Sequence, residues 1–147
     1  MYLFLINLAY ANYSHFATWE SKPDIVICGD INVTISEVKS AIQYWTKLDY
    51  KFNSIKKQNT CPVFQKEYSI LIKNKHFQNK QGSTYIEIYH YDENPHIKYI
   101  DYAIVELNQN TKLYAGENKE SLTHELGHAL GIDHVHNIKD IMYPYTR

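Results

Sequence analysis

The sequence has little of several residue types that mark particular classes of protein. Its 147 residues include two cysteines, Cys28 and Cys61, and one arginine, Arg147, and no apolar run is long enough to cross a membrane. Two cysteines do not make a disulfide framework, and the sequence alone does not decide whether these two pair. We therefore expect no membrane span, and the redox compartment stays open.

An excess of charge of one sign is also missing. Fifteen basic residues stand against sixteen acidic ones, the formal net charge is −1 at pH 7, and the lysines are spread along the chain. Nucleic-acid-binding domains carry clustered lysine and arginine, so we expect no nucleic-acid partner. With no internal repeat and no low-complexity linker, residues 1–147 are expected to form a single domain and to be a monomer.

The first residues are apolar and end in an Ala-x-Ala pattern at Ala11. They lack a positively charged start and are short for a secretory signal, so a strand or the remnant of a processed segment explains them equally well. We expect residues 1–22 to be an N-terminal extension or pro-segment. The location of the protein is not decided by this segment.

Strand and helix patterns follow in a definite order. The β-branched run Asp24–Cys28 lies between a proline and a glycine and predicts a buried strand. Thr34 and Glu37 have the spacing of a capping box, and apolar residues at helical spacing continue the helix to Leu48: Val38, Ala41, Ile42, Trp45 and Leu48.

The second half of the chain predicts strands over 68–72, 84–91 and 99–107, rich in tyrosine, isoleucine and valine. Turn-forming residues separate them at 81–83 and 92–95. A last helix is expected from about 118 to 130. One strand, a helix, several strands and a final helix make an α+β order.

Residues 124–134 carry the most specific pattern, H-E-x-x-H-x-x-G-x-x-H. His124 and His128 are four residues apart, so on a helix they share one face and can bind one zinc ion together. Gly131 lets the chain leave the helix through a left-handed conformation, which returns His134 as a third ligand. A lone histidine is usually an ordinary core or surface residue, but this register predicts a zinc site.

Glu125 lies between the first two of these ligands and is free to act as a base. Three protein ligands leave the fourth position of zinc to water, which is the layout of a catalytic site. The metal lowers the pKa of that water and polarises the substrate carbonyl. Glu125 would accept the water proton and later deliver it to the leaving amine. The pattern therefore predicts a hydrolase with one catalytic zinc ion.

The eleven-residue pattern resembles the metzincin clan of zinc endopeptidases. Met142 follows His134 by eight residues, and the segment around it, D-I-M-Y-P-Y, looks like the Met-turn, whose methionine forms an apolar floor under the three ligands. Met-Tyr-Pro is the form typical of matrixins. The resemblance implies a matrixin-like zinc endopeptidase, commonly secreted, with a zincin-like fold: a twisted, mostly parallel sheet, a backing helix and an active-site helix.

The chain departs from the matrixin pattern in several ways. It stops at Arg147, so we expect a reduced form without the C-terminal helix. The resemblance places Pro144 and Tyr145 in the wall of the pocket for the residue after the cleaved bond, although matrixins have one residue between the two. No calcium loop is visible. The only candidates for the family's second zinc fit surface positions better: His76, His90, Asp92 and His96.

Latency is a separate question, because Cys28-Gly29-Asp30 superficially resembles the motifs with which pro-segments silence such enzymes. The same residues end the predicted first strand, and we favour that interpretation.

Three functions are consistent with the sequence. The leading hypothesis is a zinc-dependent endopeptidase whose peptide or protein substrate lies along an edge strand, expected at Thr84–Tyr91. The second is a catalytically idle zinc protein that binds peptides or partners in the same cleft. Glu125 argues against it, because a binding module needs no base beside the metal. The third is a hydrolase of small peptides or amides.

Overall fold

The computed structural model describes residues 13–29, 31, 33–62, 65–109 and 117–144. Within these ranges it forms five strands and two helices, in the order β1 (Asp24–Cys28), α1 (Ile35–Thr46), β2 (Ile55–Gln58), β3 (Ser69–Lys75), β4 (Gly82–Tyr89), β5 (Tyr99–Asn108) and α2 (Glu117–Ala129).

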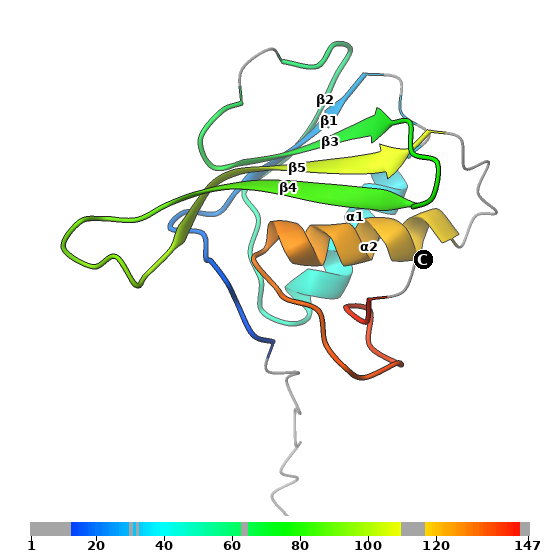
Figure 1. Ribbon diagram of the computed structural model, residues 1–147. Helices are drawn as coiled ribbons and strands as arrows, with labels where there is room; N and C mark the ends of the chain where they lie inside the picture. Colours follow the sequence, from blue (N-terminus) through cyan, green and yellow to red (C-terminus); the bar gives the residue numbers. More distant parts are fainter. Residues whose placement is uncertain (1–12, 30, 32, 63–64, 110–116, 145–147) are drawn as a thin grey trace, which may run out of the picture.

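The strands make one mostly parallel sheet with the order β2-β1-β3-β5-β4. β1 pairs in parallel with β2 and β3, β3 pairs in parallel with β5, and β4 alone runs antiparallel, beside β5. Both helices lie against one face of this sheet (Figure 1). The predicted α+β architecture, a mostly parallel sheet with a backing helix and a second helix beside it, is confirmed.

The core forms between the helices and the alternate strand residues that face them. Ile25 of β1 pairs in register with Ile70 of β3, and both are completely buried. Helix α1 begins with the predicted capping box, in which Thr34 and Glu37 exchange hydrogen bonds of 3.1 and 2.7 Å. Such a cap stabilises a helix by about 1 kcal/mol. These local signals explain why the first strand and helix were predictable.

Helix α2 packs between α1 and the strands β4 and β5. Its apolar side chains Leu122 and Leu126 are completely buried, and the indole N–H of Trp45 in α1 donates to the backbone oxygen of Thr123 at 2.8 Å. This arrangement fixes the rotation of α2, so the side of the helix beside β4 carries the histidine-rich pattern.

Two parts of the fold differ from the sequence-based expectation. Strand β2 was not predicted, because three of its four residues are exposed and polar and show no alternation. The expected turn at 81–83 was wrong for Gly82 and Ser83, which begin β4 and pair with Leu107 and Glu106 of β5. Both errors concern strands that are defined by their partners.

A disulfide joins Cys28 at the end of β1 to Cys61 in the loop after β2, a pairing that the sequence left open. Cys28 is also almost completely buried. It is therefore a structural residue of the sheet, and the interpretation of Cys28 as the end of a strand agrees with the structure, while Asp30 lies outside the described residues.

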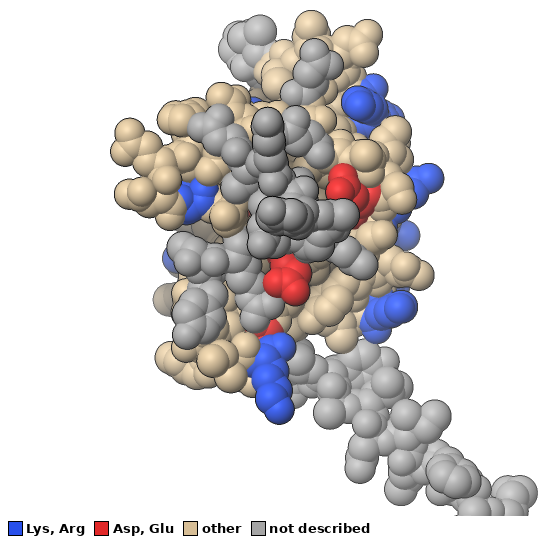
Figure 2. Space-filling model, turned by 90° about the vertical axis from the view of Figure 1, so that its right-hand side faces the viewer, with Lys and Arg blue, Asp and Glu red and all other residues tan. Residues whose placement is uncertain are grey.

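The surface shows no dominant sign of charge on the side that Figure 2 presents, where lysine and acidic side chains are both visible. No helix among the described residues is long and apolar enough to span a membrane.

Candidate metal centre and active site

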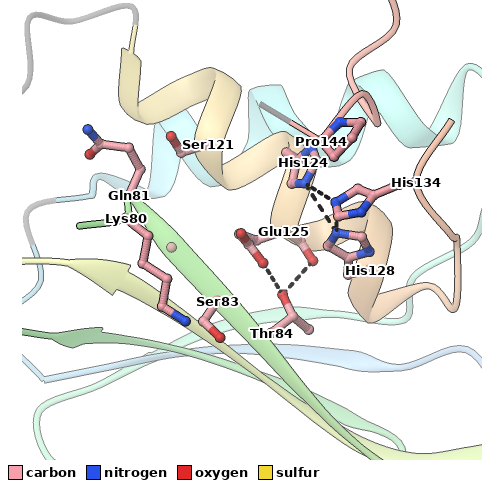
Figure 3. A pocket seen from close by; sticks show the side chains of 11 residues that line it. Lys80, Gln81, Ser83, Thr84, Ser121, His124, Glu125, His128, His134 and Pro144 are labelled. Carbon is pink, nitrogen blue, oxygen red and sulfur yellow. Dashed lines mark hydrogen bonds between the residues drawn. The ribbon is translucent and has the colours of Figure 1, made fainter. Parts of the chain in front are cut away.

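Helix α2 brings His124, Glu125 and His128 to a cavity between the helix and β4 (Figure 3). The helix ends at Ala129, and Gly131 follows with a φ of +85°, a conformation that glycine adopts without strain. The chain turns there, and His134 reaches the same place from the following segment.

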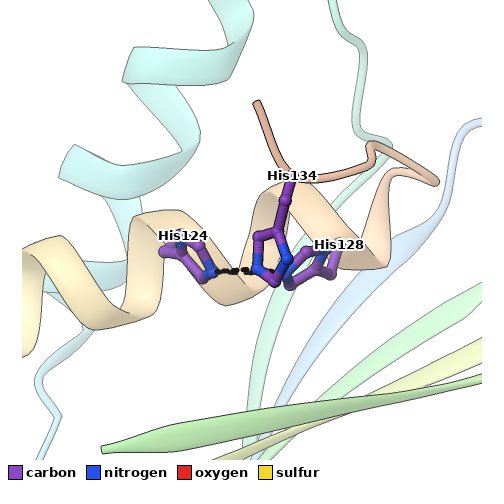
Figure 4. A group of neighbouring side chains, drawn as sticks. All are labelled: His124, His128 and His134. Atoms are coloured by element: carbon purple, nitrogen blue, oxygen red, sulfur yellow. Dashed lines mark hydrogen bonds between the residues drawn. The ribbon is translucent and has the colours of Figure 1, made fainter. Parts of the chain in front are cut away.

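The three imidazoles face one point (Figure 4). Their Nε2 atoms are separated by 3.1 Å (His124 and His128), 3.0 Å (His128 and His134) and 3.3 Å (His124 and His134). A tetrahedral zinc ion about 2.0–2.1 Å from each nitrogen requires separations of about 3.3–3.4 Å. The histidines therefore fit a zinc ion with only a slight expansion.

The second nitrogen of two of these rings is also held. Nδ1–H of His124 donates to the backbone oxygen of Ile141 at 2.6 Å, and Nδ1–H of His128 donates to that of Ile132 at 2.9 Å. A carbonyl only accepts hydrogen bonds, so these contacts place the proton on Nδ1 and leave the lone pair of Nε2 directed at the common point.

The protonation state of the histidines also favours metal binding. Burial lowers the pKa of His128 to about 4, and burial lowers the pKa of His134 as well. Both rings are therefore uncharged at neutral pH, which is the form in which imidazole binds a metal.

Glu125 is 9 % exposed and does not join the three histidines. Burial raises the pKa of its carboxyl, while the hydrogen bond from Thr84 and the charges of His124 and Lys80 act in the opposite direction. Thr84 Oγ1 lies 2.6 Å from Oε2 of Glu125, to which it donates, and 2.9 Å from the backbone oxygen of the same residue. A carboxylate with raised proton affinity and a fixed orientation is suited to accept and return a proton.

A segment at the start of the described chain, residues 13–20, holds the turn that leads to the third histidine; we call it the N-terminal strap. The N–H of Phe16 donates to the backbone oxygen of Gly131 at 2.9 Å, and the N–H of Asp133 donates to that of Ser14 at 3.0 Å. Backbone pairing thus fixes the turn on both sides of its central residue.

The strap also forms hydrogen bonds with the last residue of α2 and with the segment that follows the helix. The indole N–H of Trp19 donates to the backbone oxygen of Ala129, at the end of the helix, at 2.9 Å. The Tyr13 hydroxyl donates to the carboxylate of Asp140, with 3.0 and 3.1 Å to its two oxygens. The same carboxylate accepts the backbone N–H of Met142 at 2.8 Å.

Met142 is completely buried beneath α2. A Cβ atom on Gly127 would lie 2.3 Å from Sδ of Met142 and 2.6 Å from Cζ2 of Trp45, so a glycine is required for the methionine to approach the helix this closely. The methionine therefore fills the space under the helical turn that joins the two helical histidines.

The cavity beside the histidines has a volume of about 340 Å³. Its walls come from the loop between β3 and β4, the start of β4, α2 and the segment that follows α2: Lys80, Gln81, Gly82, Ser83, Thr84, Ser121, His124, Glu125, His128, His134 and Pro144. Pro144 lines this cavity, and Tyr145 lies outside the described residues. β4, expected to be the edge strand, is at the edge of the sheet.

Within the part of the chain that the structure describes, the three histidines are the one group of three or more possible ligands close enough to share an ion. The candidates for a second zinc are all exposed: His76, His90, Asp92 and His96.

Sequence reasoning missed Lys80, Thr84 and the N-terminal strap. Their positions depend on strand pairing and on contacts across most of the chain, and no local pattern indicates them.

Comparison with models of protein families matches residues 18–147 to the matrixin family. A comparison with curated proteins found no match. The matched span contains every helix and strand of the structure and all the residues that line the cavity.

Proposed function

The chain belongs to the matrixin family, and on this premise we propose that it is a zinc-dependent endopeptidase. His124, His128 and His134 would hold one catalytic zinc ion. The observation that supports this most is the convergence of three Nε2 atoms to within 3.3 Å of one another, two of them on rings whose Nδ1–H is already bonded to a backbone oxygen.

Hydrolysis of a peptide bond needs an activated water, a polarised carbonyl and a carrier for the proton. Bound zinc supplies the first two, because it lowers the pKa of water and withdraws electrons from a carbonyl oxygen. Glu125 supplies the third: it accepts the proton of the attacking water and transfers it to the amine that leaves. Thr84 positions this carboxylate through the hydrogen bond to Oε2.

The substrate would lie extended beside β4, whose other side pairs with β5. An edge strand offers backbone N–H and C=O groups to an incoming strand, so peptide backbone binds there independently of its sequence. Pro144, on the other side of the cavity, would contact the side chain after the cleaved bond, and we propose the same for Tyr145 from the family pattern.

The test uses the full chain, loaded with zinc, and a mixed peptide library read by mass spectrometry. We expect cleavage that stops when a chelator removes the metal and returns when zinc is restored. Glu125→Ala should keep zinc and lose cleavage, while Glu93→Ala, at an exposed glutamate outside the cavity, should cleave like the wild type. Cleavage that survives chelation, or that Glu125→Ala retains, would refute the mechanism.

The same experiment tests the alternative, a catalytically idle domain that binds peptides around a zinc ion. In that case the wild-type chain and Glu125→Ala would bind library peptides equally and cleave none. The buried position of Glu125 beside the histidines argues against this alternative, since a carboxylate that only lines a binding cleft gains nothing from a raised pKa.

A further inference from the structure

Most of the residues that line the cavity beside the histidines carry polar groups on their side chains. The three histidines, Glu125 and the backbone of Gly82 form part of the lining. The other described lining residues contribute one apolar side chain, Pro144, and five polar ones: Lys80, Gln81, Ser83, Thr84 and Ser121. A bulky aliphatic side chain placed here would remove water from an ammonium, an amide and hydroxyls without offering them hydrogen bonds, which costs free energy. The cavity therefore suits a polar side chain.

The charge of Lys80 determines which kind of polar substrate side chain the cavity suits. It is the one lysine among the described lining residues, and Glu125 is the one carboxylate, already bonded to Thr84. Among the described residues no carboxylate lies within 4.0 Å of the Lys80 ammonium. The ammonium lies instead 4.7 Å from the centre of the Phe77 ring. Apart from its longer-range effect on Glu125, its charge is thus available to a ligand in the cavity.

Asn108, the last residue of β5, holds the backbone around Lys80 in place. The side-chain amide of Asn108 donates to the backbone oxygens of Phe77 at 3.1 Å and of Lys80 at 2.9 Å. Its backbone N–H donates to the oxygen of Gln81 at 2.8 Å. Three hydrogen bonds from one residue hold the loop between β3 and β4 at the cavity, so little order must be gained when a substrate binds.

A buried polar atom in the same wall has no partner. Oε1 of Gln81 is enclosed and finds no hydrogen-bond donor among the described residues. Buried polar atoms of folded proteins are nearly always bonded, so this enclosed oxygen adds an acceptor without a described partner to the polar groups of the wall.

We propose that Lys80 makes this site selective for peptides with glutamate or aspartate directly after the cleaved bond. The inference rests on the proposed function and names the substrate class of that same site. The side-chain carboxylate of the substrate accepts a hydrogen bond from the Lys80 ammonium and one from the Ser83 hydroxyl. The pocket for the residue after the cleaved bond would lie between Pro144 on one side of the cavity and Lys80 and Ser83 on the other.

The test takes one cleaved peptide and makes four versions that differ only in the residue after the bond: Glu, Gln, Leu and Lys. A charge-assisted hydrogen bond in a partly enclosed site changes kcat/KM by about tenfold or more, so we expect Glu to exceed Gln by that factor and Lys to be poorest. Lys80→Met should make Glu and Gln equal, and Lys80→Glu should make Lys the best substrate.

The matched control is Lys75→Met. Lys75 lies 5.5 Å from the same Phe77 ring but is paired with Glu106 at 3.1 Å and does not line the cavity, so its loss should leave the preference unchanged. Three results would overturn the proposal. The wild-type chain could prefer Leu after the bond, Lys80→Met could keep the preference for Glu, or Glu could be preferred only before the bond.

Binding separates this proposal from the proposed function. Acetylated hexapeptides with Glu or Gln at one position are titrated against zinc-loaded Glu125→Ala by fluorescence anisotropy. Tighter binding of the Glu peptide, lost in Glu125→Ala/Lys80→Met, supports the acidic pocket even if the wild-type chain cleaves nothing. Equal binding of both peptides contradicts the acidic pocket, whether or not the wild-type chain cleaves peptides.

Discussion

Gly127, between the two helical histidines, provides a test in which two physical effects act in opposite directions. Alanine is favoured over glycine inside a helix by about 1 kcal/mol, so propensity alone predicts that Gly127→Ala stabilises the protein. The added Cβ, however, would lie 2.3 Å from Sδ of Met142 and 2.6 Å from Cζ2 of Trp45. Overpacking of a closed core costs roughly 1–3 kcal/mol.

We expect the steric effect to dominate, with a net loss of up to about 2 kcal/mol in the free energy of unfolding. The indole of Trp45 is held by its bond to Thr123, so Met142 must move, and the floor beneath the histidines moves with it. Tm should fall by roughly 2–4 °C per kcal/mol of lost stability for a domain of this size. Zinc affinity should fall with it.

The assay is thermal unfolding followed by circular dichroism, with zinc and with chelator, beside zinc titration against a competing chromophoric chelator. The matched control is the same substitution in a Met142→Ala background, where the shorter side chain leaves room and the cost of Gly127→Ala should shrink. A Tm and zinc affinity equal to or above those of the wild type would refute the reasoning.

Three further predictions concern the contacts around the site and the sheet. Tyr13→Phe removes the hydroxyl bonded to Asp140 and should lower the free energy of unfolding by about 1 kcal/mol in urea titrations, an effect absent if that contact contributes nothing. Thr84→Val should lower kcat by roughly tenfold with little change in KM, because Glu125, the proposed general base, loses the donor that orients it; a change in KM alone would contradict this role. The pKa of Asp24 is lowered mainly by the hydrogen bond from the Ser54 hydroxyl, so its stabilising contribution is present above the unfolded pKa of about 3.9 and is lost as pH falls through the lower folded value. Urea midpoints at pH 6 and pH 3 should therefore differ less in Asp24→Asn than in the wild type.

The parts of the fold that the sequence predicted are those with local causes. The strand Asp24–Cys28 has the observed bounds, and the capping box at Thr34 forms as expected. The helical spacing of His124 and His128 is a property of one helix, and the turn after it depends on Gly131 alone to adopt a positive φ. Such features need no knowledge of distant residues.

The parts that escaped prediction depend on residues far apart in the sequence. Strand β2 exists because Ile55 lies in register with Ile25, and its own composition is that of a loop. Thr84 meets Glu125 only because β4 lies beside α2, and the two cysteines meet across the end of β1. A single sequence contains no record of these pairings.

The N-terminal strap bears on the order in which the site assembles. The three histidines lie within eleven residues of sequence, whereas the contact of Tyr13 with Asp140 joins residues 127 positions apart. Closing the longer loop costs roughly 2 kcal/mol more chain entropy than closing the shorter one, and contacts close in sequence form first. We therefore expect the three histidines to meet while most of the chain is still unfolded, and the strap to dock late. If the proposed function holds, the chain would bind zinc during folding before its site is complete, and docking of the strap would complete that site.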